Sequence, residues 1–201
     1  YMTEKTTFQI DATVYSDLFR HSQFVTYRVK DAIVDWWMEQ AGVRPNVRLT
    51  NPDLYLNVHI AGDIVTVSLD SSGESLHKRG YRVANTQAPI NEALAAGMLL
   101  LAGWNGQGDF YDPLRGSGTL LLEAALIARN IAPGIYRKGF AFEKWANFDA
   151  DLFEDIYSDD SREREFDHKI YGSDAGYYAV QTATKNIQSA NLQRDIEVKQ
   201  I

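Results

Sequence analysis

The 201-residue chain contains no cysteine, so it can form neither a disulfide framework nor a thiolate metal site. It also lacks any apolar run near the roughly eighteen residues that a membrane-spanning helix requires. Its first residues are polar and do not resemble a signal peptide. The four histidines do not have metal-ligand spacing. We therefore expect a cytoplasmic protein that has no membrane segment and binds no metal.

An excess of basic charge is missing as well. The chain has 20 Lys and Arg against 27 Asp and Glu, a net charge of −7. This argues against a globally basic nucleic-acid binder, although it allows a local basic face. The length suffices for one large or two small domains, and a hydrophobic content of 45% is normal for a folded chain.

The first seventy residues have the pattern of a small α+β module. Residues 7–14 alternate as in a strand, and apolar spacings of three and four predict a helix over about 23–41. Two further alternating stretches, 54–60 and 64–69, flank a Gly-Asp turn and predict a hairpin. A polar, partly basic connector, residues 71–81, follows, and we place the domain boundary near its end, at about residue 80.

Residues 81–201 alternate between strand and helix patterns. Strands are expected at 109–112, 169–174 and 196–199, and helices at about 88–102, 119–130, 148–166 and 176–191. Pro89 would lie in the first turn of its helix, where a missing N–H costs nothing. The alternation predicts an α/β domain with a parallel sheet. Three strands are half of a usual doubly wound sheet, so we expect a fragment of a longer protein.

The first strand of this region leads into the sequence Asp-Pro-Leu-Arg-Gly-Ser-Gly-Thr and then into a helix. Gly116 and Gly118 would let backbone N–H groups approach a ligand at the positive end of that helix. Ser117 and Thr119 offer hydroxyls and can cap the helix. Asp112 at the strand end could accept a hydrogen bond from an amine. A tight turn without any ligand explains the same residues about equally well.

A second acidic residue, Asp174, ends the next strand. Such folds bind ribose hydroxyls with an acid at this place, although Asp174 would serve equally as a helix N-cap. The turn lacks the lysine of a P-loop, and Leu121 stands where a dinucleotide fingerprint has its third glycine. A nucleoside cofactor without a pyrophosphate fits better, and S-adenosylmethionine is such a cofactor.

Longer motifs resemble a known family, the THUMP-domain RNA methyltransferases, and above all the N-terminal half of bacterial 23S rRNA guanine-N2 methyltransferases. Proteins of this kind are often labelled N6-adenine-specific DNA methylases. The main matches are residues 112–125, 132–134 and 140–145, and others are residues 29–35, 44–47, 68–73, 76–82 and 88–92. The resemblance thus covers essentially the whole chain.

The resemblance implies two domains. Residues 1–80 would be the C-terminal part of a THUMP module that binds RNA, with its connector. Residues 81–201 would be the N-terminal half of a class I methyltransferase domain with a partial Rossmann-like sheet. The parent protein would be an enzyme that uses S-adenosylmethionine to form N2-methylguanosine in 23S rRNA.

Individual site residues follow from the matched motifs. Asp112 and the turn formed by Gly116, Ser117, Gly118 and Thr119 would hold the methionine end of the cofactor, and Asp174 the ribose. Pro89 and Glu92 would belong to a helix start that closes over the cofactor. Candidates for RNA phosphate contacts, or else a solvated surface, are Arg28, Lys30, Lys78, Arg79 and Arg82.

The chain departs from the family pattern at two points. Arg115 stands where the family has a small residue or a cysteine. The Asn-Pro-Pro-aromatic motif that orients the target amine is absent, so we assign no catalytic residue and expect the fragment alone to be inactive. Two alternatives remain open, namely a DNA adenine-N6 methylase and a non-catalytic RNA-binding or assembly module.

Aromatic pairs allow further interpretations. One of Trp36 and Trp37 would lie in a core or interface, and the other could stack on a base. Tyr177 and Tyr178 follow Asp174 and would either pack on an adenine ring or pack within their own domain.

Overall fold

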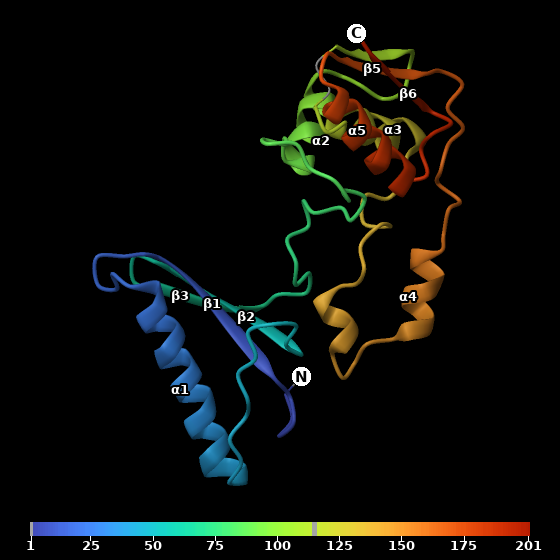
Figure 1. The fold of residues 1–201 in the computed structure, drawn as a ribbon. Coiled ribbons are helices and arrows are strands. Elements are labelled where there is room, and N and C mark those ends of the chain that lie inside the picture. The colour runs from blue at the N-terminus through green and yellow to red at the C-terminus, as the bar shows by residue number, and fades with distance from the viewer. Residues whose placement is uncertain (1, 114–115) are drawn as a thin grey trace. The chain divides into compact units, whose positions relative to one another are not determined.

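The computed structural model describes residues 2–113 and 116–201, and its ribbon is drawn in Figure 1. The chain forms two compact units. The N-terminal unit contains the residues up to Glu74 together with Gly139–Ala150, and the C-terminal unit contains Ser75–Lys138 and Asp151–Ile201. The single domain boundary near residue 80 stays a prediction, and the structure adds the return of residues 139–150 to the N-terminal unit.

The N-terminal unit is built on a three-stranded sheet of order β1-β2-β3. Strand β1 (Phe8–Tyr15) pairs in parallel with β2 (Leu54–Ala61), and β2 pairs antiparallel with β3 (Ile64–Leu69). Gly62 has a φ of 62° in the turn of this hairpin, a conformation that glycine adopts without strain. The strand and hairpin predicted from alternating residues are confirmed.

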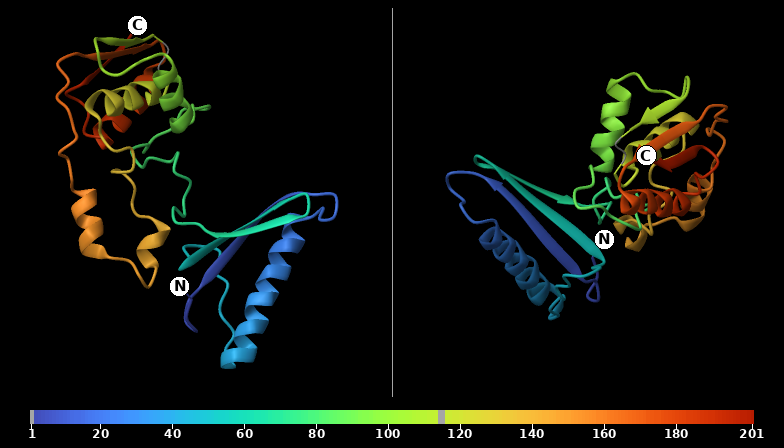
Figure 2. Two further views of the ribbon diagram at one scale, coloured as in Figure 1. Left: turned by 180° about the vertical axis from the view of Figure 1, so that it is seen from behind. Right: turned by 45° about the horizontal axis from the view of Figure 1, so that its top comes forward.

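Helix α1 (Ser22–Ala41) lies along one face of this sheet, as Figure 2 shows. Val25 and Val34 on the helix are buried with Phe8 and Val58 from the strands. Gly42 ends the helix in the left-handed conformation, as its sequence predicts. The apolar spacing of the helix therefore reflects a real core.

The returning segment packs on the N-terminal unit through polar contacts and one large side chain. Lys144, at the end of the short helix η1 (Ala141–Lys144), donates from its Nζ to the backbone oxygens of Asn51 and Pro52, at 3.1 and 2.8 Å. The Phe142 N–H donates to the oxygen of Ser71, and Trp145 packs against the core. The two Lys144 bonds join positions more than ninety residues apart.

A contact between Thr7 and Asp53 makes the stability of the same unit depend on pH. Thr7 donates to Asp53 from its backbone N–H, at 2.8 Å, and from its hydroxyl, at 2.7 Å, and both bonds lower the pKa of Asp53. A carboxyl with a lowered pKa stabilises the fold above its unfolded pKa of about 3.8, and the effect is lost as pH falls further. Asp53→Asn should therefore lose stability at neutral pH and approach the wild type in acid.

The measurement is urea unfolding of both proteins at a series of pH values. Thr7→Val is the matched control, because it keeps the backbone donor to the Asp53 carboxylate and removes the hydroxyl, which donates to that carboxylate and accepts from the Asp53 N–H at 3.1 Å. It should give a smaller pH dependence than the wild type. A difference between wild type and Asp53→Asn that stays constant with pH would contradict the assignment.

The C-terminal unit contains a second three-stranded sheet, and all its strands are parallel, in the order β4-β5-β6. The strands are β4 (Phe110–Asp112), β5 (Ile170–Asp174) and β6 (Ile196–Gln200). The helices are α2 (Glu92–Leu101), α3 (Thr119–Arg129), α4 (Ala150–Tyr157) and α5 (Tyr177–Ser189). The predicted parallel α/β sheet is confirmed.

Helices α3 and α5 lie on the same face of this sheet (Figure 1). The core between them includes Leu121, Leu122, Ile170 and Ala183, all buried completely. Alternate strand residues point to the opposite face, where the rings of Tyr111 and Tyr171 stack with centroids 4.8 Å apart. A pocket of about 410 Å³ opens beside this pair.

Two helix predictions are wrong in extent. The polar helix expected over 148–166 ends at Tyr157, because the following residues bond to the end of α3 instead, with the Arg164 N–H donating to the oxygen of Arg129 at 2.8 Å. The helix expected from Ala88 begins at Glu92, because Asn91 is its N-cap and accepts from the Leu94 N–H. Pro89 therefore precedes the helix.

Among the described residues, no helix is both long and apolar enough to cross a membrane. Within the same residues, no group of three or more His, Asp or Glu side chains is arranged to hold a metal ion. The absence of a bound metal stays a prediction.

Candidate functional site

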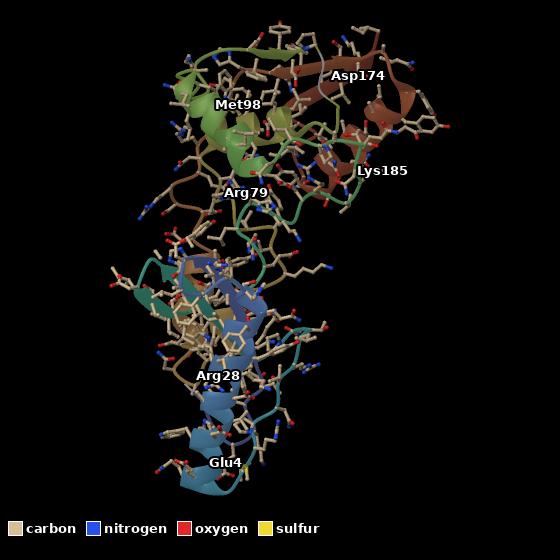
Figure 3. The ribbon with its side chains drawn as sticks, turned by 90° about the vertical axis from the view of Figure 1, so that its left-hand side faces the viewer. Glu4, Arg28, Arg79, Met98, Asp174 and Lys185 are labelled. Carbon is tan, nitrogen blue, oxygen red and sulfur yellow. The ribbon has the colours of Figure 1, made fainter. Side chains whose placement is uncertain are left out.

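Two acidic residues and the glycine-rich turn meet at one edge of the C-terminal sheet. Asp112 is the last residue of β4 and Asp174 the last of β5, and the two strands are adjacent and parallel. Asp174 accepts from the Gly116 N–H at 3.1 Å and from the Gly176 N–H at 2.9 Å (Figure 3 labels Asp174). One carboxylate thus ties the turn after β4 to the end of β5. The structure brings together the two motifs that the sequence analysis proposed as partners.

The turn lies unusually close to α5. Gly118 has a φ of 82° and is the N-cap of α3, and a Cβ at this position would lie 3.1 Å from the Cβ of Ala183. A glycine is therefore required both for the backbone conformation and for the contact with α5. The carbonyl of Gly118 accepts the first hydrogen bond of α3, from the Leu122 N–H. The turn therefore lies packed against α5, at the positive end of helix α3.

The hydroxyls of the turn face a buried arginine. Arg82 donates from Nη2 to Thr119 Oγ1 at 2.9 Å and from Nη1 to Ser117 Oγ at 3.2 Å. It also forms an ion pair with Glu92 at 2.8 Å and donates to the oxygen of Ile90 at 2.9 Å. The Arg82 and Glu92 side chains are only 13% and 7% exposed. Arg82 thus connects the start of α2 to the turn.

Asn186 on α5 is a functional candidate that sequence reasoning missed. Its side chain is 1% exposed, and its Oδ1 accepts from the N–H groups of Val83 and Ala84, each at 2.9 Å. Its Nδ2 donates to the oxygens of Ala84 and Ser117. An asparagine inside a helix has a low intrinsic propensity, and this was the one available signal that it serves another purpose.

A second ion pair, between Arg79 and the buried Glu123, holds the connector on the C-terminal unit. Glu123 on α3 accepts from the Tyr81 hydroxyl at 2.8 Å and from Arg79 Nε at 3.4 Å. Burial raises the pKa of Glu123 against the opposing effect of these two hydrogen bonds, and burial also raises the pKa of Tyr81. Arg137 holds the same connector by donating to the oxygens of Ser75 and Lys78. The part of the connector from Ser75 onward is therefore an integral part of this unit.

The candidate RNA-binding cations separate into two groups. Arg28 on α1 and Lys78 in the connector are exposed, and Lys30 is half-buried and pairs with Asp31 at 2.7 Å (Figure 3 labels Arg28). Arg79 and Arg82 instead direct their guanidinium groups to buried carboxylates. Arg82 donates four hydrogen bonds within the protein, and Arg79 donates to Glu123 and to the Leu76 oxygen, so we do not include either among the proposed RNA contacts.

The remaining candidates are placed as follows. Pro89 is exposed and lies shortly before α2, whereas the Glu92 carboxylate points inward to Arg82. Tyr177 and Tyr178 at the start of α5 are 57% and 82% exposed, so packing within their own unit does not account for them. Arg115 lies outside the described residues.

In the N-terminal unit, Trp36 is exposed and Trp37 half-buried, and their rings meet edge to face with centroids 5.4 Å apart. The expectation that one tryptophan packs inward and the other remains accessible agrees with this arrangement.

Comparison with known proteins gives concordant results. Residues 79–201 match the family of RMKL-like methyltransferase domains, and residues 1–70 match the THUMP domain. The ribosomal RNA large subunit methyltransferase K/L of Desulfotalea psychrophila is 43% identical over 99% of this chain. Because that match covers 29% of the relative, the chain spans less than a third of its length.

Solved structures agree with this assignment. A protein from Listeria monocytogenes, described as a "predicted N6-adenine-specific DNA methylase", matches the whole chain with a TM-score of 0.86 and 32% identity, over 53% of its own length. SMU.472, named as a methyltransferase and solved in complex with SAH (S-adenosylhomocysteine), matches 98% of this chain with a TM-score of 0.80 and 30% identity, also over 53% of its length.

The resemblance seen in the sequence motifs is thereby confirmed, as is the expected fold, a partial Rossmann-like methyltransferase sheet preceded by a THUMP domain. The chain belongs to the RMKL-like methyltransferase family.

Proposed function

We propose that this chain is part of an S-adenosylmethionine-dependent RNA methyltransferase that forms N2-methylguanosine in 23S rRNA. The observation that carries the proposal is the Asp174 carboxylate, which ends β5 and holds the glycine turn at the carboxyl edge of a parallel sheet. Ligands of open α/β sheets bind at this edge. The named relatives methylate ribosomal RNA, and one structural neighbour holds SAH.

The site residues receive the following roles. Each oxygen of Asp174 bonds one backbone N–H and still has a lone pair for a ribose hydroxyl. The Gly116–Thr119 turn would hold the methionine end, with backbone groups facing the ligand because the Ser117 and Thr119 side chains are buried. Asp112 would accept from the cofactor amine, and Pro89 would lie in the segment that closes over it. Glu92 would act indirectly, through Arg82.

RNA contacts are proposed for the exposed Arg28, with Lys30 two residues later on α1, and separately for the exposed Lys78 of the C-terminal unit. Phosphate contacts of this kind position an RNA without reading its sequence. No Asn-Pro-Pro sequence occurs in the chain, so we assign the group that orients the guanine amine to another part of the full protein. A ribosomal RNA substrate also implies that the protein works in the cytoplasm.

The test has two measurements. Calorimetry of the full-length protein with S-adenosylhomocysteine should show binding, because Asp174 and the Gly116–Thr119 turn are already brought together in the folded chain. Mass analysis of 23S rRNA nucleosides after deletion of the gene should show a loss of N2-methylguanosine, which the restored gene should recover.

The possible results distinguish the alternatives. Absence of binding by the wild-type protein would favour a non-catalytic RNA-binding module. Intact N2-methylguanosine together with lost N6-methyladenine in DNA would favour a DNA methylase, the activity in the description of the Listeria neighbour. Either result would overturn the proposal.

A further inference from the structure

Arg82 connects its own segment to two others of the C-terminal unit, residues 90–92 and residues 117–119. Its guanidinium donates four hydrogen bonds, to the Glu92 carboxylate, the Ile90 carbonyl and the hydroxyls of Ser117 and Thr119. Because a guanidinium is planar and has five N–H donors in a fixed fork, these bonds fix the relative positions of their acceptors. One side chain therefore links the segment before α2, the start of α2 and the turn.

The arginine is itself held in place. The residues that follow it, Val83 and Ala84, are bonded through their backbone to Asn186, which also bonds the carbonyl of Ser117. The segment is thus connected to the turn directly through the Arg82 side chain and indirectly through Asn186. The Arg82 side chain is held at its guanidinium by Glu92 and Ile90, and the backbone that follows it is held by Asn186. It therefore loses little freedom when it bonds the turn, and the arrangement is preorganised.

The ion pair has a second consequence. Glu92 is 5% exposed, and a buried carboxylate is costly unless a cation pairs with it. Arg82 meets this requirement while its remaining donors hold the turn. A lysine could neutralise Glu92 but would lack the fork needed to reach two hydroxyls and a carbonyl together.

Resting on the proposed function, we infer that Arg82 is a positioning residue for the cofactor. It would act by holding the Gly116–Thr119 turn in register with the start of α2, without touching the cofactor itself. From the sequence alone, Arg82 is a candidate RNA phosphate contact. A positioning role predicts a loss of cofactor affinity in its variants, whereas a phosphate contact predicts a loss of RNA affinity.

Arg82→Met in the full-length protein should weaken S-adenosylhomocysteine binding by about tenfold or more, the effect of losing a charge-assisted bond that orders the turn. Arg82→Lys should keep a melting temperature close to the wild type and still lose affinity. This separation of stability from affinity is a readout that a merely structural role would not produce.

Arg79→Met is the matched control. The Arg79 side chain is 14% exposed, against 13% for that of Arg82, and it also pairs with a buried glutamate. Its hydrogen bonds go to Glu123 and Leu76 and not to the turn. It should lower stability and leave S-adenosylhomocysteine affinity within about twofold of the wild type. Thr119→Val, which removes one acceptor of Arg82, should give a loss that is not additive with that of Arg82→Met.

Wild-type affinity for S-adenosylhomocysteine in Arg82→Lys would overturn the inference, as would equal affinity losses in Arg79→Met and Arg82→Met. Additive losses in the variant that combines Arg82→Met with Thr119→Val would also overturn it. So would a loss of rRNA affinity in Arg82→Met without a loss of cofactor affinity. Lys78→Ala serves as the reference for a lost RNA contact. If the wild-type protein itself does not bind S-adenosylhomocysteine, the proposed function fails, which is a distinct outcome.

Discussion

Asp174→Ala is expected to weaken S-adenosylhomocysteine binding by about 100-fold or more. Two effects add in this variant. The carboxylate would no longer accept two ribose hydroxyls, and hydrogen bonds to a charged group are worth roughly 1.5–3 kcal/mol each. The turn would also lose its bond from the Gly116 N–H to β5. Isothermal calorimetry on the full-length protein measures the change directly.

Two variants make this result interpretable. Asp174→Asn keeps one carbonyl acceptor and the side-chain volume, so it should bind with intermediate affinity. Asp109→Ala removes a similar bond at the opposite edge of the same sheet, where Asp109 accepts from the Lys169 N–H at 2.9 Å. It should leave affinity unchanged, and an Asp174→Ala variant that binds as tightly as the wild type would refute the cofactor assignment.

Gly80→Ala is expected to lower the free energy of unfolding of the C-terminal unit by roughly 3 kcal/mol or more. Gly80 has a φ of 104°, and a Cβ there would lie 2.0 Å from the backbone oxygen of Tyr136 and 2.5 Å from its carbon. The obstacle is backbone, which cannot rotate away as a side chain would. The connector would have to separate from the segment that also carries Arg137.

The measurement is chemical denaturation, with limited proteolysis of the connector as a second readout. Gly103→Ala is the control, because Gly103 also has a positive φ, of 78°, but a Cβ there meets nothing within 4 Å. It should cost only about 1 kcal/mol, the price of the left-handed conformation. Equal losses in the two variants would show that the close approach to Tyr136 is unimportant.

Many elements could be predicted because their signals are local. The apolar spacing of α1, the alternation of β2 and β3 and the acids that end β4 and β5 all lie within short windows of sequence. The errors arose where a distant partner competes with local propensity. The residues after Tyr157 bond to the end of α3 rather than extend their helix, and no local pattern reports that contact.

The candidate site divides in the same way. The sequence by itself determined the glycine turn, the two strand-end acids and the family, because a tight turn and a strand end each require particular residue types in a row. Only the tertiary structure decided what the arginines do. Arg79 and Arg82 look like neighbouring surface cations, yet Arg79 pairs with a carboxylate 44 residues away and Arg82 bonds a hydroxyl 37 residues away.

Asn186 shows the same limit, because its partners Val83 and Ala84 lie more than a hundred residues earlier. A buried charge or amide must find a partner, and folding alone determines which groups come within hydrogen-bond distance. The sequence therefore specified the edge of the sheet where a cofactor would bind. The three-dimensional packing specified the side chains that hold that edge in place.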